Sequence, residues 1–167
     1  MSARDYFKKY NHGLVFLYFF IYMPWFLYLE QKVTDDYHII HCPVDDYIPF
    51  VEIFIIPYLL WFLLIVIGGF YMFFTDRSGF LRMSALLITG MTVFLLICTV
   101  YPNGLDLRPG VFPRDNALTD LVAALYVSDT PTNVLPSMHV FDSLGICIGL
   151  VNSRTIKHRP FVKLLIH

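Results

Sequence analysis

Charged residues are scarce in this chain, and their scarcity excludes most soluble folds. Only 15% of the 167 residues are Asp, Glu, Lys or Arg, whereas 57% are hydrophobic and 17% are aromatic. A soluble domain normally carries about 25% charged residues. The composition therefore predicts an integral membrane protein, and the small net charge of −1 argues against a nucleic-acid partner.

Cysteine is also sparse, and the common cofactor motifs are missing. The three cysteines, Cys42, Cys98 and Cys147, give no disulfide framework, and the sequence contains no P-loop, dinucleotide fingerprint or internal repeat. His38, His41 and Cys42 form an H-x-x-H-C pattern that lacks the second ligand pair of a zinc site. We therefore expect a structural or solvated role for these three residues, and we expect no metal and no other cofactor.

Four apolar stretches hold most of the hydrophobic residues. They contain 17, 22, 19 and 15 residues and run over Gly13–Leu29, Ile53–Phe74, Met83–Tyr101 and Ser137–Val151. Because about 20 helical residues cross about 30 Å of hydrocarbon, we expect four transmembrane helices, the last of them short enough to start below the membrane surface. The predicted fold is an all-α, polytopic helix bundle that forms a single membrane domain over residues 1–167.

A further apolar run starts at Phe161 and stops at His167, which is too short to span a membrane. We therefore expect residues 1–167 to hold about four spans and the start of a fifth, as the N-terminal part of a longer protein. Glu52 stands at the outer entrance of the second predicted span, where we expect it to reach water.

The basic residues predict the orientation, because cytoplasmic loops of membrane proteins retain Lys and Arg. Of the twelve, nine are expected on the side of the N-terminus: Arg4, Lys8, Lys9, Arg77, Arg82, Arg154, Lys157, Arg159 and Lys163. The other three lie in segments 30–46 and 102–136. We therefore expect a cytoplasmic N-terminus, with both segments on the extracytoplasmic side.

A histidine at the start of the last predicted helix is the main candidate for chemistry. Pro136 disfavours helix at Leu135 and Ser137 is a good N-cap, so this helix is expected to begin at Ser137 with His139 in its first turn. The free N–H groups and dipole of a helix start favour an anion, and imidazole exchanges protons near neutral pH. The pattern suggests phosphate chemistry; for a histidine alone, the alternative is a hydrogen bond to a loop carbonyl.

Segment 102–136 is expected to be the active-site loop. Arg108 and Arg114 lie there among acidic residues, on the side that otherwise excludes positive charge. Arginine binds phosphate oxygens in a bidentate fork, and the alternative for either arginine is a surface ion pair with Asp106 or Asp115. The loop joins the third span to the histidine helix, so a phosphate held by Arg108 would meet the histidine.

Arg108-Pro109, followed by Pro136-Ser137-Met138-His139 at the start of the next span, resembles the first two motifs of the type 2 phosphatidic acid phosphatase superfamily. This superfamily is related to vanadium haloperoxidases, and its lipid-acting members have a six-helix membrane core. Residues 101–109 and 129–139 look most like bacterial members related to inositol phosphotransferases of sphingolipid synthesis. The resemblance implies a lipid phosphatase or phosphotransferase of the bacterial plasma membrane, whose substrate is a membrane lipid phosphate ester at the extracytoplasmic face.

The resemblance also implies roles for the motif residues. Arg108 would bind the phosphoryl oxygens, and Ser137 with its neighbouring N–H groups would hold the phosphate. His139 would be the general acid that protonates the leaving alcohol. Pro109 and Pro136 would support these residues.

Two further residues take their roles from this comparison. The family's first motif begins with lysine where this chain has Tyr101, so Tyr101 would bind phosphate without a charge and Arg114 would compensate. Asp142 lies one helical turn after His139, where it would either touch the histidine or make a plain intrahelical contact.

The superfamily's third motif, which supplies the nucleophilic histidine and an aspartate, is missing. Ser153-Arg154 resembles its start, but Pro160 stands where the histidine belongs, and the pair falls in a predicted cytoplasmic loop. We therefore expect the complete protein to react through a phosphohistidine, and residues 1–167 alone to show no turnover. A non-catalytic membrane protein that binds lipid headgroups would also explain these departures, and a transporter is disfavoured because the spans carry no paired broken helices.

Overall fold

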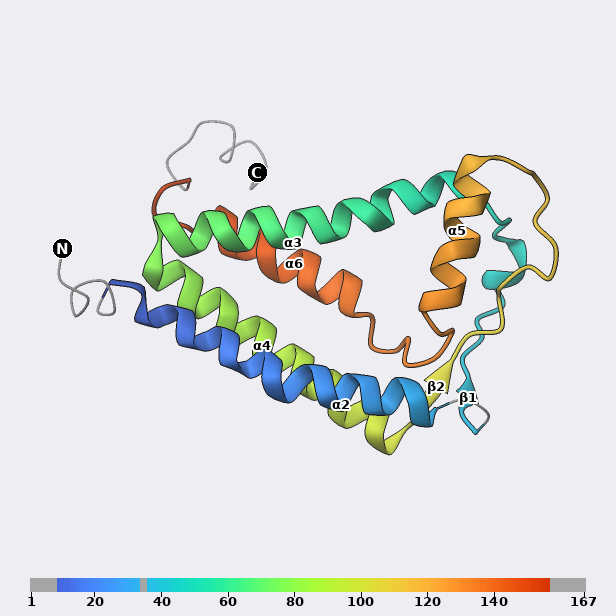
Figure 1. The fold of residues 1–167 in the computed structure, drawn as a ribbon, viewed down its shortest axis with the longest axis horizontal. Coiled ribbons are helices and arrows are strands. Elements are labelled where there is room, and N and C mark those ends of the chain that lie inside the picture. The colour runs from blue at the N-terminus through green and yellow to red at the C-terminus, as the bar shows by residue number, and fades with distance from the viewer. Residues whose placement is uncertain (1–8, 34–35, 157–167) are drawn as a thin grey trace.

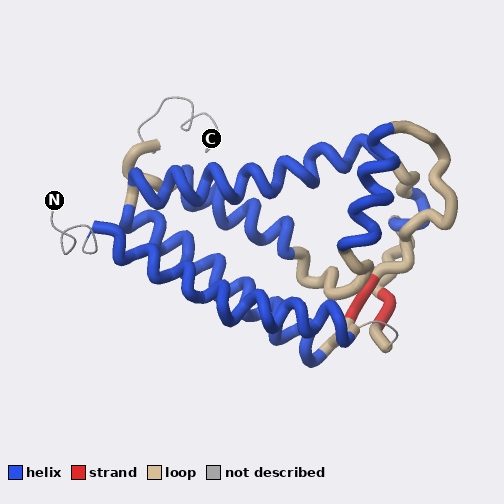
Figure 2. Tube along the Cα trace, in the orientation of Figure 1, coloured by secondary structure: helices blue, strands red, loops and turns tan. Residues whose placement is uncertain are grey.

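The computed structural model describes residues 9–33 and 36–156, and it is mostly helical (Figures 1 and 2). Three helical segments are long and apolar enough to cross a membrane, namely Asn11–Lys32, Glu52–Thr75 and Arg77–Val100. The first consists of η1 (Asn11–Tyr18) and α2 (Phe19–Lys32), the second of η3 (Glu52–Phe54) and α3 (Ile55–Thr75), and the third is α4 (Arg77–Val100). Two shorter apolar helices, α5 (Ala117–Ser128) and α6 (Met138–Val151), complete the helical part.

Three of the four predicted spans correspond to the long helices. The fourth, α6, has 14 residues and is as short as expected, so it is not long enough to be counted with the others. α4 begins at Arg77, six residues before the predicted Met83, because the Asp76 side chain accepts a hydrogen bond from the Gly79 N–H (2.9 Å) and caps the helix. The apolar run from Phe161 lies outside the described residues.

α6 packs between α3 and α4, and glycines let the helices approach closely. A Cβ atom on Gly90 of α4 would lie 2.0 Å from the Phe141 ring, and one on Gly145 of α6 would lie 2.7 Å from the Leu87 side chain. Because only hydrogen fits in these positions, the helix backbones can meet without a cavity. Ile146 is buried in this contact, with Met72, Phe80 and Met83.

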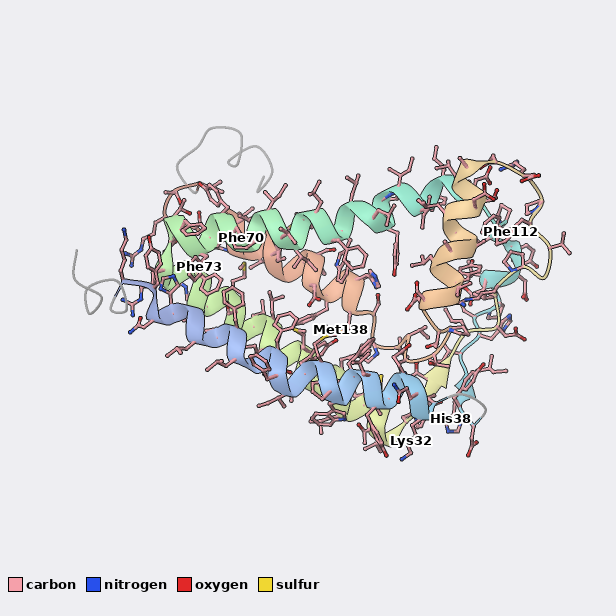
Figure 3. The ribbon with its side chains drawn as sticks, viewed as in Figure 1. Lys32, His38, Phe70, Phe73, Phe112 and Met138 are labelled. Atoms are coloured by element: carbon pink, nitrogen blue, oxygen red, sulfur yellow. The ribbon has the colours of Figure 1, made fainter. Side chains whose placement is uncertain are left out.

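A second core cluster joins α2 to α4. Its buried members are Tyr22, Leu29, Phe94, Leu95 and Cys98. Met138 at the start of α6 packs against this cluster and extends toward α2 (Figure 3). Outside these contacts the helices expose large apolar side chains, such as Phe62 at 49% and Leu63 at 52%, which is the surface expected of helices in lipid.

The predicted outer segments 30–46 and 102–136 lie together at one end of the molecule. Strands β1 (His38–Ile39) and β2 (Asn103–Gly104) pair in parallel, and Gly104 also bridges Thr132. The short η2 (Asp45–Tyr47) follows β1. This pairing agrees with the prediction that both segments share one side.

The predicted active-site loop contains a helix that was not expected. α5 begins after Asn116, whose side chain accepts hydrogen bonds from the N–H groups of Leu118 and Thr119 (2.9 and 3.1 Å) in a capping box. Figure 1 shows α5 crossing from the start of α3 toward β2. The helix therefore divides the loop into two parts, of which the first holds both arginines.

Candidate functional site

The helix of the candidate histidine starts where the sequence predicts. Ser137 is the N-cap of α6, its hydroxyl accepts a hydrogen bond from the Val140 N–H (3.4 Å), and its carbonyl accepts one from the Phe141 N–H (3.1 Å). His139 therefore lies in the first turn of α6, as expected. Ser137 is exposed, so its hydroxyl stands at the surface of the helix start.

The His139 ring lies against two aromatic residues of α3. Its centroid is 4.2 Å from the Trp61 ring and 4.9 Å from the Tyr58 ring. The buried Nε2 atom of His139 has no hydrogen-bond partner among the described residues, and the same is true of the buried Nε1 of Trp61. Among the described residues, Nε2 of His139 thus makes no hydrogen bond to a loop carbonyl, as the alternative interpretation would have it, and this atom keeps its capacity to exchange a proton.

Asp129, at the end of α5, is an acid within electrostatic reach of this histidine. Burial raises the pKa of the Asp129 carboxyl above its ordinary value, and the nearby charge of Glu30 raises it further. The charges of Arg108 and His139 and a hydrogen bond with the Tyr58 hydroxyl act in the opposite direction. The Asp129 carboxyl therefore lies within electrostatic reach of both candidate residues.

Arg108 is held at the C-terminal end of α5. Its guanidinium donates hydrogen bonds to the carbonyls of Tyr126 (3.1 Å) and Asp129 (2.7 Å) and lies 4.2 Å from the centre of the Tyr126 ring. A cation at this place also complements the helix dipole. The predicted alternative, an ion pair with Asp106 or Asp115, is not found for Arg108 in the described part of the chain. Because arginine has five N–H donors, three remain for an anion.

Arg114, the other arginine of this segment, lies in a different contact. Its guanidinium pairs with the Glu52 carboxylate (2.8 Å), which also accepts a hydrogen bond from the Asn116 side chain (3.1 Å). The ion-pair alternative is therefore correct for Arg114, although the partner is Glu52 and not Asp106 or Asp115. Glu52 is 8% exposed, so it meets arginine where the sequence suggested water.

Two residues of the predicted site are not brought to His139. The Tyr101 ring stacks on the His38 ring, with centroids 4.4 Å apart and planes inclined by 5°, and no hydrogen bond joins it to Arg108 within the described ranges. Asp142 is buried, but its Oδ1 has no partner and its side chain makes no hydrogen bond to His139. The acid beside the histidine comes instead from the end of α5, ten residues earlier in the sequence.

The prolines of the two motifs flank the site residues. Pro109 follows Arg108 and is partly buried, and Pro136 directly precedes the N-cap of α6. Ser153, by contrast, is fully buried at the far end of α6, about 20 Å along the helix from His139 at 1.5 Å per residue. Ser153-Arg154 is therefore remote from the site, as the sequence predicted.

Two polar residues that the sequence did not single out, the buried Asn103 and the partly buried Glu30, organise the segment before α6. The Asn103 side chain accepts hydrogen bonds from the N–H groups of Val134 (3.1 Å) and Leu135 (2.8 Å) and donates one to the Leu135 carbonyl (2.9 Å). Glu30 accepts hydrogen bonds from the Thr130 hydroxyl (2.6 Å) and the Asn133 side chain (3.1 Å). The polar residues in segment 129–133 indicate that this segment needs hydrogen-bond partners. Which residues supply them depends on the tertiary fold, so the sequence alone does not identify Asn103 and Glu30.

The histidines of segment 30–46 have other contacts. His41 hydrogen-bonds with the Asp46 carboxylate (2.8 Å), and His38 stacks on Tyr101. Within residues 9–33 and 36–156, no three side chains of His, Cys, Asp or Glu lie together as a metal site.

Comparisons of the chain with protein-family models, with curated proteins and with solved structures found no match. The resemblance to the phosphatidic acid phosphatase superfamily therefore rests on the motif residues and on how the fold arranges them.

Proposed function

We propose that the chain belongs to a membrane-embedded phosphatase or phosphotransferase that acts on lipid phosphate esters. The observation that carries this proposal is that Arg108 and His139, 31 positions apart in the sequence, are both connected to Asp129. Arg108 donates a hydrogen bond to the Asp129 carbonyl (2.7 Å), and the His139 ring lies 4.9 Å from that of Tyr58, whose hydroxyl hydrogen-bonds with the Asp129 carboxyl. A fixed cation and an unpartnered imidazole nitrogen at a helix start are the groups that phosphoryl transfer requires.

In the proposed reaction, Arg108 binds the non-bridging oxygens of the phosphate and stabilises the charge that develops on them. His139 donates the Nε2 proton to the leaving alcohol oxygen as the bond between phosphorus and oxygen breaks. The first N–H groups of α6 and the Ser137 hydroxyl hold the same phosphate. The nucleophile would be a histidine of the third motif, which the resemblance places C-terminal to α6.

The proposed location follows from the long apolar helices and the basic residues. With the N-terminus in the cytoplasm, the end that carries α5, β1 and β2 faces the extracytoplasmic side. The site then lies at the level where the phosphate of an outer-leaflet lipid would be found.

A second candidate function is headgroup binding without turnover. It is favoured by the contacts of Arg108, which already uses two N–H groups on carbonyls, and by Tyr101, which stacks on His38. Such a protein would bind a lipid phosphate at the same residues and release it unchanged.

The test is phosphate release from dioleoyl phosphatidic acid and from polyprenyl pyrophosphate by the protein as its gene encodes it, in detergent. We expect His139→Ala and Arg108→Ala each to lower the rate at least a hundredfold. His38→Ala and Lys32→Gln, which alter a histidine and a cation outside the site, should leave it unchanged.

Activity unaffected by either site variant would overturn the proposal. Saturable binding of dihexanoyl phosphatidic acid that both site variants weaken, with no phosphate release, would establish the second candidate in its place. Residues 1–167 tested alone should bind and not turn over.

A further inference from the structure

The end of the molecule opposite His139 has a polar cavity of about 460 Å³ around the turn between α3 and α4. It is lined by Thr75, Asp76, Arg77, Ser78, Leu81 and Arg154. Both carboxylate oxygens of Asp76 are already used, one by the Gly79 N–H and the other by the Arg154 N–H, each at 2.9 Å. The acid in this cavity is therefore satisfied by the backbone and needs no cation.

Positive charge exceeds negative charge around the cavity. Arg77 donates a hydrogen bond to the Asn11 side chain (2.7 Å), but the guanidinium groups of Arg82 and Arg154 make neither hydrogen bonds nor ion pairs within the described part of the chain. Three arginines thus surround one aspartate. Unpaired guanidinium groups with planar N–H donors favour a phosphate-bearing anion.

An apolar groove of about 360 Å³ runs between α3 and α6 and ends at the same place. Leu63, Ile67 and Leu150 line it, and it ends at Tyr71 and Ile156. The two hollows are adjacent in the fold, because Tyr71 lies one helical turn before Thr75, whose hydroxyl donates to the Tyr71 carbonyl (2.6 Å). On the other wall, Ile156 lies two residues after Arg154 of the polar cavity.

We propose that cavity and groove together bind one anionic glycerophospholipid, with its phosphate at Arg77 and Arg154 and an acyl chain along α3 and α6. Charge and shape both favour this occupant. A packed helix would cover the groove but would leave the arginines without an anion, and a free phosphate ion would not use the groove. Anionic lipids are concentrated in the cytoplasmic leaflet, where positive residues of membrane proteins gather.

The experiment is lipid titration of the delipidated full chain, followed by native mass spectrometry, with dioleoyl phosphatidylglycerol and dioleoyl phosphatidylcholine as probes. These lipids share acyl chains and phosphate and differ in net charge. We expect tighter binding of phosphatidylglycerol, weakened about 25-fold in Arg77→Gln/Arg154→Gln, since each of the two cations near an anionic lipid contributes roughly a fivefold gain. Lys32→Gln, which removes an exposed cation at the other end of the molecule, should bind as the wild type does.

The groove is tested with Leu63→Trp, whose larger side chain fills it from a half-exposed position. This variant should weaken the binding of both lipids. Circular dichroism and the thermal midpoint check that each variant is folded, and Arg154→Gln alone replaces the double variant should it unfold. Equal affinity for the two lipids, or unchanged affinity in the arginine variants, would overturn the proposal. Displacement of the lipid by millimolar inorganic phosphate would assign a bare anion site instead, and wild-type affinity in Leu63→Trp would exclude the acyl-chain groove.

Discussion

Two aspartates lie at helix ends on opposite sides of the molecule, and their surroundings act on them in opposite directions. Asp76, between α3 and α4, accepts two backbone hydrogen bonds, from Arg154 and Gly79, and these hold its pKa below the ordinary value. Asp129, after α5, is raised in pKa by burial and by the charge of Glu30. The fold therefore stabilises the charged form of Asp76 and disfavours the charged form of Asp129.

The same contrast holds for the two ends as a whole. At the Asp76 end, a single residue connects two long helices. At the Asp129 end, segments from α2, α3, α5 and α6 meet, and buried polar atoms of Trp61, Asn133 and His139 have no partner there among the described residues. Near the Asp76 end, His12 Nδ1 is also without a partner, although its Nε2 hydrogen-bonds with the Phe73 carbonyl. Buried polar groups without partners are unfavourable for folding and call for an explanation. The contrast indicates a structural role for Asp76, and it is consistent with the function proposed for the Asp129 end.

The largest effect on stability is expected from Asn103→Ala, which would remove the hydrogen bonds that hold the segment before α6 at the end of the candidate site. Asn103 is fully buried, and its loss would leave the N–H groups of Val134 and Leu135 without an acceptor. We expect a loss of about 3 kcal/mol in the free energy of unfolding, measured by denaturant titration in detergent. Asn152→Ala, which removes one exposed hydrogen bond, is the control and should cost less than about 0.5 kcal/mol. Equal costs would mean that Asn103 does not organise this end.

Asp76→Ala tests the opposite end and should cost about 2 kcal/mol, because it removes a helix cap together with the acceptor for the Arg154 N–H. Since the folded pKa of Asp76 is lowered, its stabilisation is present above the unfolded pKa of about 3.9 and is lost as the pH falls through the folded pKa. Thermal unfolding of wild type and variant should therefore converge in acid. A difference that persisted unchanged to the lowest pH would contradict a charge-dependent cap.

Asp129→Asn should show a smaller effect with the reverse pH dependence. Because the folded pKa of Asp129 is raised, the contribution of this one group to stability is greatest below its unfolded pKa of about 3.9 and is lost as the pH rises through the folded pKa. The asparagine variant, which carries no charge, should lack this loss. Thermal midpoints from pH 3 to pH 8 measure it, with Asp106→Asn, an exposed aspartate, as the control. If the thermal midpoints of wild type and Asp129→Asn changed with pH in parallel, burial would not disfavour the charge of Asp129, and the two aspartates would not differ as described.

Sequence patterns were sufficient where one local rule decides the structure. The long helices follow from apolar length, and the start of α6 follows from Pro136 and Ser137. The start of α4 was placed too late because Arg77 and Arg82 were assigned to a loop, although a single cap at Asp76 was enough to start the helix. α5 also had a local signal, since Leu118, Leu121, Val122 and Leu125 have helical spacing after an Asn cap.

The site was predictable only in part, because its contacts join distant segments. His139 and Arg108 could be singled out from their residue types and positions, whereas the acid beside them could not. Asp142 is near His139 along the helix, yet it is Asp129, at the end of another helix, whose charge acts on the histidine. The place of Tyr101 in a motif predicted that it binds phosphate, but in the structure its ring stacks on the His38 ring beside the paired strands. Such partners depend on tertiary packing, which spacing in one segment does not encode.

The smallest effect is expected from Arg114→Gln, at the start of α5. The Arg114 side chain is 59% exposed, so its ion pair with Glu52 is screened by water, and its loss should cost at most about 1 kcal/mol. Glu52→Ala should cost more, because the buried Glu52 also accepts the Asn116 hydrogen bond that holds the cap of α5. Unfolding at low and high salt measures both variants and the double variant. If Arg114→Gln instead lowered the free energy of unfolding as much as Asn103→Ala does, the stability of this end would depend on its surface charges as much as on its buried polar residues. The difference between this end and the Asp76 end would then not lie in buried polar contacts.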